Sequence, residues 1–204
     1  MQMLEDKTGV EQAMHALAAQ LEAAGAGRFE LVVIGGAALN VLGTVSRATR
    51  DVDVLALGAG HATGVSLIKS KPLPEALLAA SDRVARDLGL GEGWLNAGPA
   101  DLLDHGMPPG FADRLVPTRY GAGLTVYYPA REDLVALKVY AAADTGVGRH
   151  TQDLEALSPT PAELFAGAVW ARTQDPSEGF RSMLVALLNY AGATEEAERL
   201  DDDA

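Results

Sequence analysis

The 204-residue sequence contains no cysteine, which excludes disulfide bonds, thiolate catalysis and a cysteine-based zinc site. No apolar run reaches the roughly 18 residues that a membrane-spanning helix needs, so we expect no membrane contact. The N-terminal stretch MQMLEDKTGVEQ lacks the charged and apolar regions of a secretory signal, which predicts a cytoplasmic protein. The few histidines lie far apart, without the spacing of metal ligands: His15, His61, His105 and His150.

Basic residues are also scarce, because 16 Lys and Arg stand against 28 Asp and Glu, a net charge of −12. Part of this excess lies in the C-terminal stretch TEEAERLDDDA. The balance argues against broad electrostatic capture of nucleic acid. A local basic cleft remains open, with these candidate members: Arg47, Arg50, Lys69, Lys71 and Lys138.

The length corresponds to about one domain, and 48% apolar residues suffice for a hydrophobic core. We see no internal repeat and no linker long enough to separate two independent domains. We expect a core with its N-terminal helix over residues 1–157 and a helical extension with an acidic tail over residues 158–204.

Hydrophobic periodicity predicts an α/β (α+β) chain, with strands and helices in its first part and a helical C-terminal region. Strands are expected at 30–34, 51–57 and 124–130. Thr160 and Glu163 form a capping box that predicts the start of a helix. The Gly-rich segment 58–74 is expected to be a loop, and the charged tail at 194–204 is expected to fray. Further helices are expected at about 10–25, 37–43, 74–90, 99–106, 131–144 and 178–190.

Two acidic residues stand out in the predicted strand DVDVLAL. The period-two geometry of a strand places Asp51 and Asp53 on one face, about 6 to 7 Å apart. Flanking apolar residues indicate that this strand is at least half-buried, where two like charges repel unless a cation neutralises them. Oxygen ligands of this kind suit Mg²⁺ or Mn²⁺. The alternative is that both acids form ordinary ion pairs with Arg47 and Arg50.

A glycine pair, Gly35 and Gly36, directly follows the predicted strand FELVVI. A strand that turns through glycine into a helix can present backbone N–H groups to an anion, and glycine lets a phosphate approach closely. Alone, such a pair is also typical of a tight turn without a ligand. Together with an acid pair on the next strand, it predicts a site for a nucleoside triphosphate.

The run VVIGGAALNVLGTVSRATRDVDVLAL resembles the signature of the DNA polymerase beta-like nucleotidyltransferase superfamily. Its R-x-T-x-D-x-D portion, formed by Arg47, Thr49, Asp51 and Asp53, is most similar to a bacterial branch that contains the AbiEii and MenT toxins of toxin–antitoxin systems. The resemblance implies a nucleotidyltransferase core, a small mixed sheet flanked by helices. In this core the acid pair binds metal, and the residues that contact the nucleotide are Gly35, Gly36, Arg47 and Thr49.

In that branch a later lysine and aspartate complete the site, and the matching positions are Lys138 and Asp153. Independently, Lys138 lies beside the apolar stripe of its predicted helix and therefore needs a partner. It could instead extend from the edge of the core towards solvent, and Asp153 could simply favour a helix N-terminus. Two departures matter: many members have serine at the position of Gly36, and the strand LTVYYPA lacks the third carboxylate that many members carry.

The first functional hypothesis is therefore an enzyme that transfers a nucleotide from an NTP, with Mg²⁺ or Mn²⁺, to an unidentified acceptor such as a tRNA end, a protein or a small molecule. A toxin held by an antitoxin partner is a variant of it. The alternative is a non-catalytic nucleotide- or partner-binding module with a degenerate nucleotidyltransferase fold.

Overall fold

The computed structural model of the chain describes residues 3–62 and 64–202. Contacts divide the chain into two compact units. The first comprises Met1–Leu103 and Gly110–Pro129, and the second comprises Asp104–Pro109 and Ala130–Ala204. A mixed sheet with flanking helices in the first unit and helices throughout 131–202 confirm the predicted α/β class.

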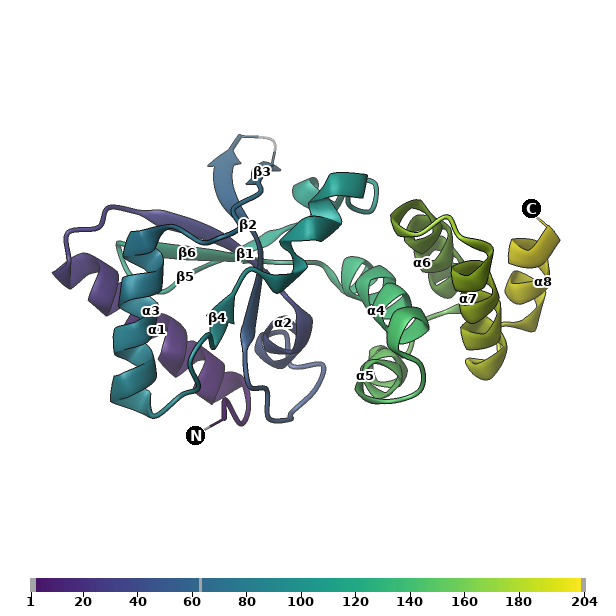
Figure 1. The fold of residues 1–204 in the computed structure, drawn as a ribbon, viewed down its shortest axis with the longest axis horizontal. Coiled ribbons are helices and arrows are strands. Elements are labelled where there is room, and N and C mark those ends of the chain that lie inside the picture. Colours follow the sequence, from purple (N-terminus) through teal and green to yellow (C-terminus); the bar gives the residue numbers. More distant parts are fainter. Residues whose placement is uncertain (1–2, 63, 203–204) are drawn as a thin grey trace. The chain divides into compact units, whose positions relative to one another are not determined.

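The first unit contains the sheet and the helices beside it (Figure 1). Its helices and strands, in chain order, are α1 (Lys7–Ala23), β1 (Phe29–Ile34), α2 (Gly35–Val41), β2 (Val52–His61), β3 (Gly64–Ile68), α3 (Glu75–Leu88), β4 (Leu95–Asn96), the 3-10 helix η2 (Phe111–Asp113), β5 (Val116–Arg119) and β6 (Leu124–Tyr128). A longer 3-10 helix, η1 (Gly98–His105), begins in this unit.

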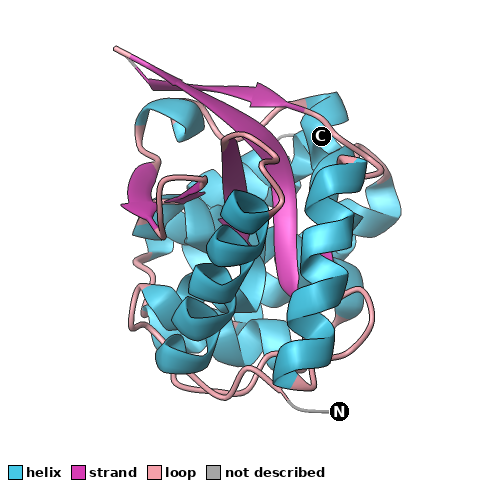
Figure 2. Ribbon diagram, turned by 90° about the vertical axis from the view of Figure 1, so that its left-hand side faces the viewer, coloured by secondary structure: helices cyan, strands magenta, loops and turns pink. Residues whose placement is uncertain are grey.

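The sheet has the strand order β3-β2-β1-β6-β5, with the short β4 paired to β2. β1 runs antiparallel to β2 and parallel to β6, which makes the sheet mixed. Its residues Leu31–Ile34 are all buried, as expected for a central strand. α1 contacts both α2 and α3, and Figure 2 shows α1 and α3 side by side in front of the strands.

Segment 58–74, expected to be a loop, is partly a β-hairpin. β2 continues to His61, and β3 pairs with it antiparallel from Gly64 to Ile68. Glycine is present because the strand is crowded: a Cβ at Gly58 would lie 3.2 Å from ring atoms of Tyr127. The glycines that favour a loop in the sequence are therefore explained by cross-strand packing.

The second unit is helical, with α4 (Arg131–Thr145), α5 (Arg149–Leu157), α6 (Pro161–Gln174), α7 (Glu178–Tyr190) and α8 (Thr194–Asp202). α4 is buried along most of its length and contacts α5, α6 and α7. Gly167 allows α6 to approach α4 closely, since a Cβ at Gly167 would lie 3.1 Å from the Cα of Ala136 on α4. The predicted capping box is confirmed: Glu163 N–H donates to Thr160 Oγ1, and Thr160 N–H donates to Glu163 Oε2.

The C-terminal tail was expected to fray, but it forms α8 through Asp202. α8 packs on α6 and α7, and its residues Ala197 and Leu200 are buried.

Within the described residues 3–62 and 64–202, no helix is both long and apolar enough to cross a membrane. The division by contacts falls before α4, whereas the expected boundary of the catalytic core at residue 157 lies after α5 and stays a prediction.

The loop between α2 and β2 is held in place by a buried amide. Asn40, fully buried on α2, donates from Nδ2 to the carbonyl oxygen of Arg47 at 2.8 Å and accepts from the Arg47 N–H at 3.3 Å. Two residues later, Thr49 exchanges backbone hydrogen bonds with Leu4, at 2.9 and 2.8 Å. These two attachments fix the chain just before the acid pair.

We predict that Asn40→Ala lowers the free energy of unfolding by about 1–3 kcal/mol, because it leaves both backbone groups of Arg47 without their partner. Asn189→Ala is the matched control, since the Asn189 side chain is exposed and bonds only the Val185 carbonyl of its own helix. The control should change stability by less than about 0.5 kcal/mol. Urea denaturation measures both, and equal effects of the two substitutions would contradict the role given to Asn40.

Candidate active site

Asp51 and Asp53 lie at the start of β2 and share one face of the chain. Both are partly exposed, while the alternating residues Val52 and Val54 are buried. Asp51 directly precedes the strand and Asp53 is its second residue. This alternation agrees with the predicted period of two, so the two carboxylates are presented on the same side.

Asp53 lies against the backbone of Gly35, because Ile34 and Asp53 are register partners in the antiparallel pair β1–β2. A Cβ at Gly35 would lie only 2.5 Å from Asp53 Oδ2. Gly35 also has φ +74°, a left-handed conformation that side chains disfavour. The Asp53 carboxylate thus needs the space that a side chain at position 35 would take. The contact of Gly35 with a phosphate stays a prediction.

Gly36 makes room for two other members of the predicted site. A Cβ at Gly36 would lie 3.1 Å from Thr49 Oγ1 and 3.2 Å from a guanidinium nitrogen of Arg47. Thr49 is 2% exposed, and its hydroxyl lies 3.2 Å from the Asp51 carbonyl oxygen and 3.4 Å from Asp51 Oδ1. Glycine at this position, where many members have serine, thus avoids a tight contact with Thr49 and Arg47.

Asn96 on β4 is a member of this cluster that the sequence did not reveal. It is the register partner of Asp53 on the side of β2 opposite β1, and its Nδ2 donates to Asp53 Oδ1 at 3.2 Å. Its Oδ1 accepts from the Gly98 N–H at 2.8 Å, which orients the amide so that Nδ2 faces Asp53. The sequence signal, one Asn before Ala-Gly-Pro, is typical of any turn.

In the second unit, Lys138 and Asp153 form a buried ion pair. Lys138 on α4 donates from Nζ to Asp153 Oδ2 on α5 at 2.7 Å, and their side chains are only 5% and 1% exposed. The partner that Lys138 needs is thus supplied within its own unit. α5 begins at Arg149 with Gly148 as its N-cap, and the Thr151 hydroxyl accepts from the Gly148 N–H and donates to the Gly148 carbonyl oxygen. Asp153 lies beyond this first turn.

The donors available to a metal are two carboxylates. Among residues 3–62 and 64–202, no group of three or more His, Asp or Glu side chains is arranged to hold a metal ion. β6, the strand parallel to β1, is filled by the buried residues LTVYY and supplies no acid. One or two carboxylates together with substrate phosphates are nevertheless a usual ligand set for Mg²⁺, so Asp51 and Asp53 fit that ion.

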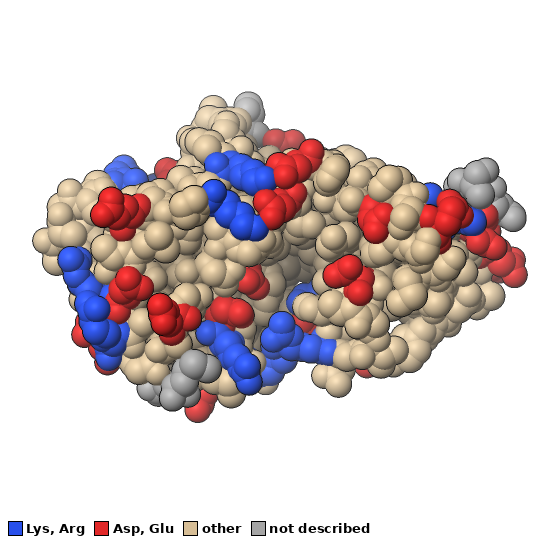
Figure 3. Space-filling model, in the orientation of Figure 1, with Lys and Arg blue, Asp and Glu red and all other residues tan. Residues whose placement is uncertain are grey.

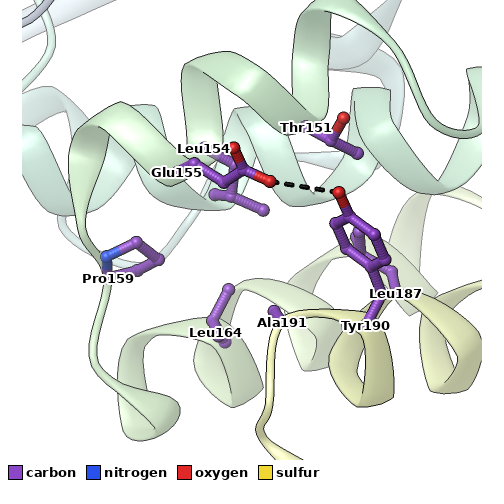
Figure 4. A pocket seen from close by; sticks show the side chains of 8 residues that line it. All are labelled: Thr151, Leu154, Glu155, Pro159, Leu164, Leu187, Tyr190 and Ala191. Carbon is purple, nitrogen blue, oxygen red and sulfur yellow. Dashed lines mark hydrogen bonds between the residues drawn. The ribbon is translucent and has the colours of Figure 1, made fainter.

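A separate cavity of about 410 Å³ lies in the second unit, where α5, α6 and α7 meet (Figure 4). Polar and apolar groups share its wall equally, and the Tyr190 hydroxyl donates to Glu155 Oε1 across it at 3.1 Å. This bond raises the pKa of Tyr190 above its ordinary value. None of the predicted site residues lines this cavity, whose residues are Thr151, Leu154, Glu155, Pro159, Leu164, Leu187, Tyr190 and Ala191.

A protein-family model described as "Nucleotidyltransferase of unknown function (DUF6036)" matches residues 12–156. The chain belongs to this family. No curated protein and no solved structure matches the chain. The DUF6036 match supports the nucleotidyltransferase superfamily and covers every predicted site residue, from Gly35 to Asp153.

We predict that Gly35→Ala destabilises the protein more than Gly43→Ala does. The two glycines have nearly the same φ, +74° and +73°, so the left-handed conformation costs each variant about 1–2 kcal/mol. A Cβ at Gly43 meets nothing within 4 Å, whereas one at Gly35 meets the Asp53 carboxylate. Chemical denaturation of both variants measures the cost of the contact between the new Cβ and the Asp53 carboxylate. Equal losses of stability would contradict the close approach of Asp53 to residue 35.

A double-mutant cycle tests the buried ion pair. Lys138→Met leaves the Asp153 carboxylate buried without its cation and should lower stability by about 3–5 kcal/mol. Adding Asp153→Asn should recover part of this loss. The exposed pair Lys7–Glu11, at 3.7 Å, is the control and should contribute less than about 0.5 kcal/mol. Additive effects of the two substitutions in the buried pair would contradict the coupling.

Proposed function

We propose that the protein is a metal-dependent enzyme that transfers a nucleotide from an NTP to an acceptor. The observation that carries the proposal is the Asp51–Asp53 pair, presented on one half-buried face beside Gly35. Two carboxylates so placed are unfavourable unless a cation compensates them. The family match supports the same class of chemistry.

Asp51 and Asp53 would hold Mg²⁺ or Mn²⁺ against the triphosphate. When bound, such an ion stabilises the negative charge that develops during phosphoryl transfer. The protein's own contribution is to orient the ligands. The Thr49 hydroxyl lies at hydrogen-bond distance from Asp51, and the Asn96 amide donates to one oxygen of Asp53. The second oxygen of Asp53 lies over Gly35.

We propose that the triphosphate lies along the turn from β1 into α2. The N-cap residue of this helix is Ile34, whose apolar side chain cannot accept a hydrogen bond from the first backbone amides. The N–H groups of Gly35 and Gly36 are therefore candidates for phosphate contacts. The Arg47 guanidinium beside Gly36 adds positive charge. Transfer then joins an acceptor oxygen to the α-phosphorus and breaks its bond to the oxygen of the departing pyrophosphate.

The roles of Lys138 and Asp153 are also proposed from the resemblance to the AbiEii and MenT toxins. In this proposal Lys138 neutralises charge on the pyrophosphate, and Asp153 holds the ammonium in position through their 2.7 Å ion pair. A toxin function, an antitoxin partner, an acceptor such as tRNA and a cytoplasmic location belong to the same proposal. Growth arrest on expression of the native chain, but not of Asp51→Asn, would support the toxin function.

A non-catalytic nucleotide-binding module is the second candidate. It is favoured by the lack, among the described residues, of a third acid grouped with Asp51 and Asp53. Incubation with labelled NTPs, Mg²⁺ and cell extract distinguishes the two candidates. Label on RNA, protein or a small molecule supports the enzyme, whereas saturable NTP binding without transfer supports the module.

We predict that Asp53→Asn abolishes this transfer without lowering the thermal midpoint, because asparagine keeps the shape and one acceptor oxygen but removes the charge. Asp82→Asn, an exposed position on α3 of the same unit, is the control and should keep full transfer. The assay and a thermal melt are run on both variants. Full transfer by Asp53→Asn would refute the assignment of the acid pair.

A further inference from the structure

Two lysines of the first unit converge on one exposed carboxylate. Lys69 Nζ lies 2.9 Å from Asp101 Oδ1, and Lys71 Nζ lies 2.5 Å from Asp101 Oδ2. The lysines follow β3, and Asp101 lies in the first turn of η1. All three side chains are open to solvent, with exposed fractions of 36%, 43% and 60%. Asp101 thus presents one carboxylate oxygen to each of the two ammonium groups.

This cluster is joined to the acid pair by a short series of hydrogen bonds. Lys71 Nζ also donates to the Gly98 carbonyl oxygen at 3.4 Å, and the Gly98 N–H donates to Asn96 Oδ1 at 2.8 Å. Asn96 in turn donates to Asp53. The lysines therefore lie beside the proposed reaction centre, within the same compact unit.

The lysines and the glycine turn lie on opposite sides of Asp53. β2 pairs with β1 on one side, where Ile34 faces Asp53 and leads into Gly35. It pairs with β4 on the other side, where Asn96 faces Asp53 and leads to Gly98. If the triphosphate occupies the β1 side, the lysines on the β4 side are available to a second ligand.

The ligand that suits two converging ammonium groups is a phosphate. Asp101 already presents two carboxylate oxygens, one to each ammonium, and its pKa is held below the ordinary value by Lys71 first and by Lys69 second. A phosphate also offers several oxygens, with equal or greater charge, and lysine is a usual point-charge phosphate ligand. Because all three groups are solvated, exchange of one anion for another requires little desolvation.

The acidic net charge of the chain does not prevent such binding. The second unit carries 15 acidic and 6 basic residues, whereas the first unit carries 13 acidic and 10 basic residues. Basic side chains on the face in Figure 3 form several small groups rather than one continuous basic surface. A site for a single phosphate fits this distribution better than a broad nucleic-acid interface does.

We propose that Lys69 and Lys71 bind a phosphate group of the acceptor, and that Asp101 occupies their site until that phosphate replaces it. This inference rests on the proposed nucleotidyl transfer and narrows its acceptor to a phosphate-bearing molecule. The phosphate belongs either to a nucleic acid strand or to a free nucleotide. Asp101 acts as an internal competitor, which a purely structural ion pair would not do.

The test is equilibrium binding, measured without NTP so that it does not depend on catalysis. The probes are a labelled single-stranded oligoribonucleotide, followed by fluorescence anisotropy, and a nucleoside monophosphate, followed by calorimetry. Lys69→Gln/Lys71→Gln should weaken binding by roughly tenfold or more, and for the oligoribonucleotide it should reduce the salt slope by about 0.7 for the one phosphate lost. Asp101→Asn should strengthen binding several-fold. Lys7→Gln, at an exposed lysine of α1, is the matched control and should bind like the native chain.

Tighter binding by Asp101→Asn together with weaker binding by the lysine variant supports the proposal, and the probe that responds identifies the source of the phosphate. If the double variant does not fold, Lys71→Gln and Asp101→Asn alone make the same comparison. Unchanged binding by Asp101→Asn, or native affinity without the lysines, overturns it. Transfer activity that persists beside such a result would leave the proposed function intact, while phosphate binding without transfer would reject the function alone.

Discussion

The close approach of the Asp53 carboxylate to the backbone of Gly35 is the constraint on which the candidate site depends. It requires the β1–β2 register that sets Ile34 opposite Asp53, the left-handed φ at Gly35 and the absence of a side chain there. Any residue with a Cβ would have to displace the carboxylate or shift the turn. Glycine adopts this left-handed turn without steric cost, and the result is an acid held where a strand ends and a helix begins.

The neighbouring contacts stabilise the same arrangement from several directions. Asn40 and Leu4 hold the loop that carries Arg47 and Thr49, and Asn96 orients Asp53 from the far side of β2. Thr49 and Arg47 pack close to Gly36, where a Cβ would be in tight contact with both. The Asn96 amide and the Thr49 hydroxyl are thus two of the groups that orient the acids before any ligand binds.

The parts of this site that follow from local chemistry could be predicted from the sequence. The buried run of β1, its turn through two glycines and the alternation of Asp51 with Val52 all depend on neighbouring residues, and the structure agrees with them. The capping box of Thr160 and Glu163 is local in the same sense. The DUF6036 match agrees with the superfamily inferred from this region.

The features that escaped prediction depend on contacts between distant segments. Gly58 and its neighbours resemble a loop in sequence but form a hairpin crowded by Tyr127, and the acidic tail forms α8 because Ala197 and Leu200 are buried against other helices. Asn96 has no local signature, since only the pairing of β4 with β2 brings it to Asp53. Periodicity likewise could not show that Lys138 pairs with Asp153 across two helices.

The most direct test of the central claim is anomalous diffraction from crystals of the full chain grown with Mn²⁺ and an NTP analogue that resists transfer. The account predicts a Mn²⁺ peak about 2.1 Å from carboxylate oxygens of both Asp51 and Asp53, in contact with the triphosphate. A triphosphate bound elsewhere, with no peak between these two carboxylates, would contradict it.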